Sequence, residues 1–348
     1  MISTFLDAVA GDVTIEAFFS KSAEIETMLA FEAALARAQA DLGLIPTDAA
    51  AKIETACHSF AADPSVLSAG MARDGVVGPA FVTALRATIG EEHGKWLHWG
   101  ATSQDLVDTG LVLRLRQVVT HLEARLADLI QALQHLRGLE GGIRLMAQTR
   151  MQRALPFTAA DKIDTWLRPL ERNRLRLHQL LPRILVVQFG GPIGTRSNLD
   201  GRGDLVADKL AELLHLGAAP AWHTARDGIV ELGNWLSLVS GTLGKIGADT
   251  VLMAQNEVDT VRLPGGSSSA MPHKSNPVVG EILVALARFN AGLAGTLNNA
   301  LVHENERSGS AWALEWLVLP QMAVTTAAAL NHARRLANDV HFVPDPKI

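Results

Sequence analysis

Residues 105–139 read DLVDTGLVLRLRQVVTHLEARLADLIQALQHLRGL, the longest helical pattern in the chain. Leucine and valine side chains return every three to four residues along it, from Leu106 through Leu122 to Leu136. The spacing places them on one face of a helix and predicts about 35 helical residues, or about 50 Å at 1.5 Å per residue. Helices of globular proteins average only about 11–12 residues. A helix of this length needs equally long partners to bury its apolar face.

Further stretches with helical periodicity surround the first one. The sequence predicts helices at residues 22–42, 157–181, 224–258, 277–301 and 320–338. Glycine and serine recur along 224–258, which favours the close approach of another helix. The best strand candidate, at 184–189, is short. The sequence therefore predicts an all-α fold, with an N-terminal helical domain over 1–97 and a bundle of long helices over 98–348.

The composition narrows the class of protein. The chain has 348 residues, of which 48% are hydrophobic, and a formal net charge of −5 at pH 7. These values are typical of a folded globular protein and argue against nucleic acid or an anionic membrane surface as the main partner. Cys57 is the only cysteine, so no internal disulfide can form, which fits a reducing compartment. With no signal-peptide pattern at its start and no run of 18 apolar residues, we expect a soluble cytoplasmic protein.

The length of the predicted helices also bears on assembly. One chain of this size supplies few partners for helices that are so long. A bundle that pools helices from several subunits is the natural solution. We therefore expect an oligomer.

A polar loop, GGSSSAMPHKSNP at residues 265–277, lies between two predicted helices. Its glycines permit positive φ angles, and its prolines prevent a helix from forming across it. Asn276 and Pro277 are explained equally well as the N-cap and first residue of the next helix, and three serines are by themselves more typical of a flexible linker. The alternative is catalytic. A serine whose alkoxide is stabilised by Lys274 and by backbone N–H groups can act as a base.

Four more polar clusters lie at predicted helix ends. They are HWGATSQD at 98–105, QTRMQR at 148–153, AWHTARD at 221–227 and HENERS at 303–308. Each is explained alone by a helix cap or by surface charges. Together they place cations and hydroxyls at the ends of long helices, which favours a small substrate with several carboxylates. The sequence has no metal-ligand spacing, phosphate loop or dinucleotide fingerprint, so we expect chemistry without a metal or cofactor.

The polar loop also carries the resemblance to a known family. Residues 268–277, with Glu281 after them, closely resemble the signature loop of the fumarase/aspartase superfamily. Residues 100–105 and 149–152 resemble its first and second conserved regions. Several stretches are similar to the bacterial 3-carboxy-cis,cis-muconate cycloisomerases in particular, namely 188–191, 222–227, 241–246 and 306–308 with Trp312, Glu315 and Trp316.

The resemblance implies a fold, an assembly and a reaction. The fold is a fumarase/aspartase-like bundle of long helices, and four copies of the chain pool their helices into a homotetrameric core. Active sites lie where three subunits meet. The implied reaction is cofactor-free: a carboxylate of the small tricarboxylate 3-carboxy-cis,cis-muconate adds across a double bond and closes 4-carboxymuconolactone, in protocatechuate breakdown.

The resemblance also assigns roles position by position. Ser268 matches the proton-transfer serine, and Lys274 and Asn276 match the carboxylate-binding pair. The full set of substrate-binding residues that we expect is Asn276, Thr102, Ser103, Gln152, Arg150, Arg226, Arg307 and His98.

Two features depart from the superfamily. The lyases have a histidine after the threonine of the second region, where this chain has Arg150. An arginine there suits a substrate with three carboxylates. The chain also ends at Ile348, well before many relatives do, so we expect the small C-terminal domain to be absent. A C–N lyase of the adenylosuccinate or argininosuccinate type and a non-catalytic structural relative remain alternatives.

Overall fold

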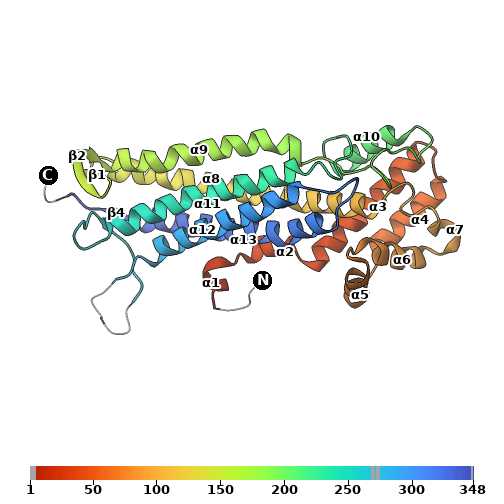
Figure 1. The fold of residues 1–348 in the computed structure, drawn as a ribbon, viewed down its shortest axis with the longest axis horizontal. Helices are drawn as coiled ribbons and strands as arrows, with labels where there is room; N and C mark the ends of the chain where they lie inside the picture. Colours follow the sequence, from red (N-terminus) through yellow and green to blue (C-terminus); the bar gives the residue numbers. More distant parts are fainter. Residues whose placement is uncertain (1–4, 268–270, 272–274, 346–347) are drawn as a thin grey trace.

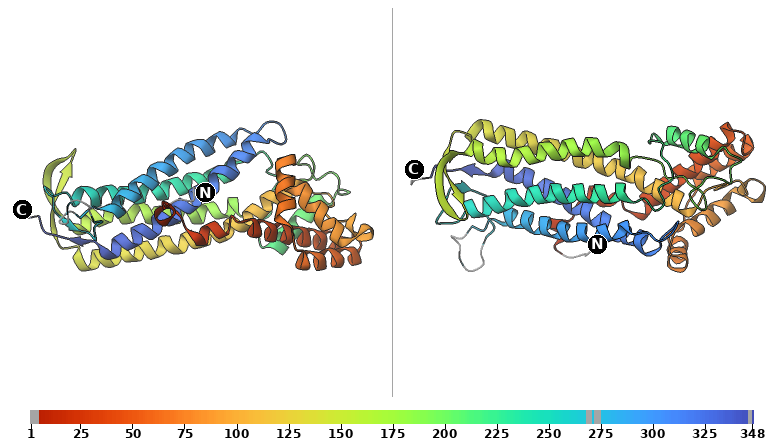
Figure 2. Two further views of the ribbon diagram at one scale, coloured as in Figure 1. Left: turned by 90° about the horizontal axis from the view of Figure 1, so that it is seen from below. Right: turned by 45° about the horizontal axis from the view of Figure 1, so that its top comes forward.

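In the computed structural model, which describes residues 5–267, 271, 275–345 and 348, the chain forms a long bundle with a smaller group of helices at one end (Figure 1). Two further views show the same division (Figure 2). The C-terminus lies at the end of the bundle that is remote from the small helices. The long axis of the molecule therefore follows the long helices.

Five long helices of the described part form the bundle. They are α8 (Ser103–Glu140), α9 (Ala159–Ile184), α11 (Asp227–Met253), α12 (Val278–Asn298) and α13 (Ser310–Asp339). α8 packs on α9 and α13, and α11 packs on α9, α12 and α13. α8 has 38 residues, and its predicted apolar face is buried from Leu106 to Leu136. The predicted all-α bundle is confirmed.

α11 and α12 approach each other closely because small residues line their shared face. A Cβ atom on Gly244 would lie 2.4 Å from the Cβ atom of Ala287. One on Gly247 would lie 2.5 Å from the carbonyl oxygen of Gly280. Larger residues at either glycine would force the two helices apart. The small-residue face predicted for 224–258 is thus a helix contact.

The smaller group of helices has a hydrophobic core of its own. Its members are α3 (Lys21–Asp41), α4 (Thr47–Ser59), α5 (Pro64–Asp74), α6 (Gly78–Ile89), α7 (Glu91–Gly94) and α10 (Gly203–Leu214). This core contains Phe31 and Phe81, but also Phe189 and Leu210 from much later in the chain. The predicted boundary at residue 97 therefore does not coincide with the division between the two cores. The short helices α1 (Asp7–Ala10) and α2 (Val13–Ala17) pack on α13 instead.

A two-stranded hairpin follows α8 at the end of the bundle that is remote from the small helices (Figure 1). β1 (Arg144–Thr149) pairs antiparallel with β2 (Gln152–Thr158), with Thr149 opposite Gln152. The two residues between the strands, Arg150 and Met151, have φ angles of 49° and 62°. Two consecutive positive φ angles are the pattern of a type I′ turn, which usually selects asparagine or glycine. A second small pair, β3 (Val261–Arg262) with β4 (His341–Phe342), lies nearby.

Three local predictions were wrong. Residues 184–189 form no strand, because Val186 makes only an isolated bridge to Gly217. The last long helix begins at Ser310 and runs through Pro320, since the turns before the proline are held in the core. Asn276 is not the N-cap of α12: its backbone pairs with Gly266 in both directions, and the helix begins after Pro277.

α12 and α13 are both long and apolar enough to cross a membrane by length and composition alone. The apolar window of α13 is 67% buried inside the protein, as in a core helix, whereas that of α12 is only 28% buried. On α12, the side chain of Phe289 is 45% exposed and lies beside an apolar groove of about 340 Å³ between α1, α12 and α13. α12 therefore presents an apolar face that a single chain leaves uncovered.

Candidate active site

The amino-terminal end of α8 carries the first predicted site residues. Thr102 is the N-cap of this helix, and Ser103 is its first helical residue. The backbone N–H of Thr102 donates to Asp105 Oδ2 at 3.0 Å, so the cap is held by the first turn. The unpaired N–H groups of a helix start and the positive end of its dipole favour a bound carboxylate. Both hydroxyl residues thus occupy a position suited to an anionic substrate.

Asp105 also fixes the loop that lies against this helix end. Its carboxylate is fully buried. Oδ1 accepts from the N–H of Gly190 at 2.8 Å and contacts Nε2 of His223 at 2.8 Å, and Oδ2 accepts from the N–H of Gly191 at 2.9 Å. A carboxylate oxygen is an acceptor, so this contact favours the tautomer of His223 in which Nε2 is the donor. A Cβ atom on Gly190 would lie 2.8 Å from the imidazole of His223, so glycine is needed for this close approach.

Arg226 lies in the interior near this helix end and forms a buried ion cluster. It donates two hydrogen bonds to Asp108, at 2.6 and 3.0 Å, and two to Glu315, at 2.8 and 2.5 Å. All three side chains are fully buried, and the guanidinium lies 4.7 Å from the ring centre of Trp222. Burial lowers the pKa of Arg226, but the charges and hydrogen bonds of the two carboxylates outweigh it and raise that pKa overall.

This geometry corrects the expected role of Arg226. Four of the five N–H groups of this guanidinium bind the two carboxylates, and the side chain is out of contact with solvent. We therefore propose a structural role for Arg226 in place of the expected contact with substrate.

Arg307, from the loop between α12 and α13, lies at the same helix end in a different environment. Its Nε donates to Gln104 Oε1 at 3.2 Å, and its Nη2 donates to the carbonyl oxygen of Pro192 at 3.0 Å. The residue is exposed, and its Nη1 makes no hydrogen bond to any residue that the structure describes. An arginine held along one edge and open along the other is suited to binding a carboxylate.

His98 precedes the α8 cap and pairs with a buried carboxylate. Its Nδ1 lies 2.5 Å from Oε1 of Glu32, which is itself buried. Burial lowers the pKa of His98, but the charge and hydrogen bond of Glu32 and the charge of Asp105 outweigh it, and the pKa is raised overall. The backbone φ of His98 is 62°, a conformation that few residues other than glycine adopt. The α8 cap is thus preceded by an imidazole whose charged form is favoured.

The remaining predicted site residues lie at the opposite end of the bundle. Arg150 and Gln152 are exposed on the β1–β2 hairpin. Asn276 lines a cavity of about 580 Å³ together with Arg262. Ser268 and Lys274, the two predicted catalytic residues, lie outside the described residues.

One chain therefore carries two groups of site residues that are far apart. The α8 half-site comprises His98, Thr102, Ser103 and Arg307, and the hairpin half-site comprises Arg150, Gln152 and Asn276. The two groups occupy opposite ends of the bundle (Figure 1), and α8 alone measures about 57 Å along its axis at 1.5 Å per residue. No small substrate spans that distance, so the two half-sites of one chain cannot act on the same molecule.

Sequence reasoning missed several buried polar residues of the α8 end. Gln104 and Asp108 are fully buried beside Asp105, in the first two turns of a helix whose buried face is mostly leucine and valine. Three polar residues on the first turns of such a helix were the available signal. They hold the half-site together without being exposed to a substrate.

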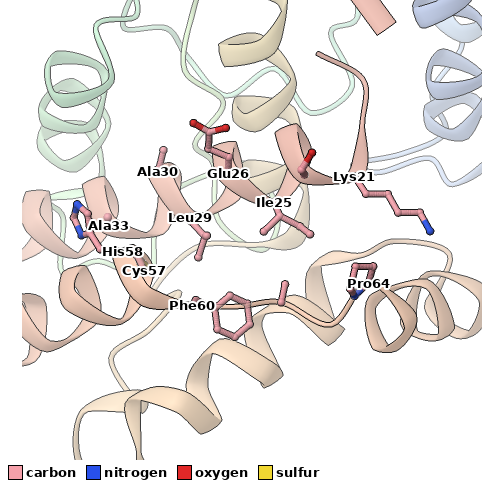
Figure 3. Close-up of a pocket in the computed structure, with 12 residues that line it drawn as sticks. Lys21, Ile25, Glu26, Leu29, Ala30, Ala33, Cys57, His58, Phe60 and Pro64 are labelled. Atoms are coloured by element: carbon pink, nitrogen blue, oxygen red, sulfur yellow. The ribbon is translucent and has the colours of Figure 1, made fainter. Parts of the chain in front are cut away.

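Within the residues that the structure describes, no group of three or more His, Cys, Asp or Glu side chains is placed to hold a metal ion. A groove of about 540 Å³ lies between α3 and the segment after α4, where Ile25 and Leu29 lie opposite Phe60 (Figure 3). None of the predicted site residues lines this groove.

Comparison with known proteins places the chain in a family. A family profile described as lyase matches residues 6–289. The 3-carboxy-cis,cis-muconate cycloisomerase of Pseudomonas aeruginosa is 41% identical over 335 residues, which cover 94% of this chain and 73% of that protein. Trans-aconitate decarboxylase 1 of Mycosarcoma maydis is 34% identical, with 98% of this chain and 70% of that protein covered.

A solved structure shows the same fold. The crystal structure of the 3-carboxy-cis,cis-muconate lactonizing enzyme from Pseudomonas putida superposes with a TM-score of 0.90 at 39% identity, and covers 97% of this chain and 77% of that chain. The chain therefore belongs to the lyase family of the fumarase/aspartase superfamily, among relatives that include the 3-carboxy-cis,cis-muconate cycloisomerases.

Proposed function

We propose that the protein is a cofactor-free cycloisomerase that converts 3-carboxy-cis,cis-muconate to 4-carboxymuconolactone. The observation that carries this proposal is an exposed arginine at each half-site, in a chain that is 41% identical to a cycloisomerase of that name. Arg307 supplies positive charge at one half-site, and Arg150 supplies it at the other. A substrate with three carboxylates matches this distribution of charge.

The proposed chemistry depends on positioning and on charge stabilisation. One substrate carboxylate oxygen attacks an alkene carbon, and the electron pair moves onto the neighbouring carbon and its carboxylate, which becomes enolate-like. Holding the attacking oxygen near that carbon contributes about 7–11 kcal/mol to the lowering of the barrier. Lys274, the α8 amino terminus and the arginines stabilise the developing charge. A proton then reaches the α-carbon from Ser268 or from a group that Ser268 relays to.

We propose further that the active enzyme is a homotetramer. Each site then combines the α8 half-site of one subunit with residues of the hairpin half-site from other subunits, as expected for sites where three subunits meet. The separation of the half-sites within one chain requires such sharing. The uncovered apolar face of α12 supports this assembly, because an exposed face of this kind marks a protein contact. We also propose a cytoplasmic location, which the single cysteine Cys57 favours.

A C–N lyase of the adenylosuccinate or argininosuccinate type is the alternative. Those lyases have a histidine where this chain has Arg150. The exposed arginine at the tip of the hairpin removes that acid–base partner and adds a carboxylate-binding group instead. The cycloisomerase is therefore the better-supported function.

The test is an ultraviolet assay on the purified protein. Addition of the protein to 3-carboxy-cis,cis-muconate should abolish the absorbance of the conjugated diene, and 4-carboxymuconolactone should form in equal amount. Adenylosuccinate and argininosuccinate should release no fumarate. Fumarate release from either compound, with the muconate unchanged, would refute the proposal in favour of a lyase.

A further inference from the structure

We infer that Gln104 is a positioning residue that aims Arg307 at the substrate. The inference rests on the proposed function, because it assigns Arg307 to a substrate carboxylate. Gln104 belongs to the polar cluster at 98–105, but the sequence analysis gives it no role of its own. Its side chain is uncharged and completely buried.

The orientation of the Gln104 amide is fixed by its neighbours. Its Nε2 donates to Oδ2 of Asp108 at 3.2 Å and to the backbone carbonyl oxygen of His223 at 2.8 Å. Both neighbours are acceptors only, so the NH₂ group must face them. The amide oxygen is thereby turned toward Arg307, where it accepts from Nε at 3.2 Å. If the amide were flipped, its oxygen would face the oxygens of Asp108 and of the His223 carbonyl, and its NH₂ group would face the Arg307 guanidinium.

The acceptor Asp108 is itself held in place by the buried ion cluster. Its two oxygens receive hydrogen bonds from Arg226 at 2.6 and 3.0 Å, and Oδ1 also accepts from Nε1 of Trp312 at 2.9 Å. Gln104 thus connects a rigid buried network to an exposed arginine. This connection gives the structural arginine, Arg226, an indirect effect on the orientation of Arg307.

The position of Gln104 in the fold links the arginine to the rest of the half-site. Gln104 is the second residue of α8, directly after Ser103 and two residues after the Thr102 cap. The second contact of Arg307, from Nη2 to the carbonyl oxygen of Pro192, leaves Nη1 open toward the solvent side. With Nε and Nη2 both held, the guanidinium loses its freedom to swing away before a substrate binds. Preorganisation of this kind strengthens binding by lowering the entropy lost on association.

A double-mutant cycle with Gln104→Met, Arg307→Lys and the double variant tests the inference. Methionine keeps the length of the side chain but removes the amide, and lysine keeps the charge but removes the Nε donor. Gln104→Met should raise KM for 3-carboxy-cis,cis-muconate by about tenfold, the loss expected for one hydrogen bond to a charged group, while kcat changes much less. In the Arg307→Lys background the same substitution should change KM less than twofold, because the contact is already absent.

Ser240→Ala is the matched control. Ser240 is equally buried and hydrogen-bonded, to Thr326 and Asn290, but lies in the middle of the bundle. This variant should lower the melting temperature without changing KM. If Gln104→Met does not fold, Gln104→Asn replaces it in the cycle, because asparagine is shorter by one methylene group and holds its amide farther from Arg307. An unchanged KM in the Gln104 variant, or an equal fold-change in both backgrounds, would overturn the inference.

The same proteins separate this inference from the proposed function. Binding of propane-1,2,3-tricarboxylate, measured by calorimetry, gives a second readout of the cycle that needs no turnover. A wild-type protein that leaves the muconate unchanged but binds the tricarboxylate would refute the proposed reaction. The double-mutant cycle, measured through the Kd of the tricarboxylate, would still decide the role of Gln104.

Discussion

Replacing Arg226 by methionine should destabilise the protein strongly without acting on substrate directly. The guanidinium makes four hydrogen bonds to Asp108 and Glu315, and all three side chains are fully buried. Methionine retains much of the volume but removes the cation that both buried carboxylates share, leaving Asp108 with its contact to Trp312 and Glu315 beside His303. Removing one partner of a buried ion pair costs about 3–5 kcal/mol, because the remaining charge is desolvated and unpaired.

The cost converts to a measurable shift in melting temperature. Unfolding entropy is about 2.1 cal/mol/K per residue near 60 °C, so 348 residues give about 0.7 kcal/mol/K, and the loss corresponds to about 4–7 °C. Thermal melts followed by circular dichroism, with chemical denaturation in parallel, measure it. The variant Asp108→Asn/Arg226→Met/Glu315→Gln should recover much of the loss, because no buried charge is left unpaired.

The outcome also decides between two roles for Arg226. A variant that melts like the wild type but no longer binds the tricarboxylate would refute the structural role and return Arg226 to the substrate-binding set. A triple variant that is less stable than the single one would refute the electrostatic reasoning, because it would trace the loss to packing rather than to unpaired charge.

Four more predictions concern other parts of the molecule. Arg150→His should raise KM for the tricarboxylate about tenfold with an unchanged melting temperature, since Arg150 is exposed; an unchanged KM would show that it does not touch the substrate. Phe289→Glu should dissociate the oligomer in size-exclusion chromatography with light scattering, because it places a charge on the uncovered face of α12, and an intact oligomer would contradict the proposed contact. Burial raises the pKa of Glu315, but hydrogen bonds and charges from Arg226 and His303 outweigh it and lower the pKa below its ordinary 4.5. The folded state therefore binds fewer protons at Glu315 than the unfolded state, and stability should fall as the pH drops below about 4.5. Denaturation series from pH 6 to pH 3 should show a weaker pH dependence for Glu315→Gln. Burial, followed by the charges of Glu32 and Glu54, raises the pKa of Cys57 to about 12, so the folded protein should not react with a thiol reagent at pH 8, and rapid labelling without denaturant would contradict this placement.

Local sequence was sufficient for the long helices and for the cap of α8. Each helix shows its own apolar periodicity, and the Thr102 cap and its Asp105 partner are only three residues apart. Local sequence did not predict features that depend on contacts between distant residues. The hairpin tip has positive φ at Arg150 and Met151 without the glycine or asparagine that such a turn usually requires, so the turn left no local signal.

The sequence also showed which residue types the site contains, but it did not show which role each residue has. Arg226 and Arg307 look alike as arginines next to polar clusters. One is enclosed by carboxylates that lie 118 and 89 positions away in the chain, and the other is exposed beside Gln104. Burial and partner identity are properties of distant contacts, and these separate a structural charge from one that is open to substrate.

Neighbouring residues were enough to predict the helical class, the long bundle and the family, because apolar periodicity, helix caps and the signature loop are local patterns. The separation of the two half-sites within one chain, and the burial of particular charges, became visible only in the folded molecule. A rigid helix of about 57 Å sets the distance between its ends, and the burial of a charge depends on residues that meet only when the chain has folded.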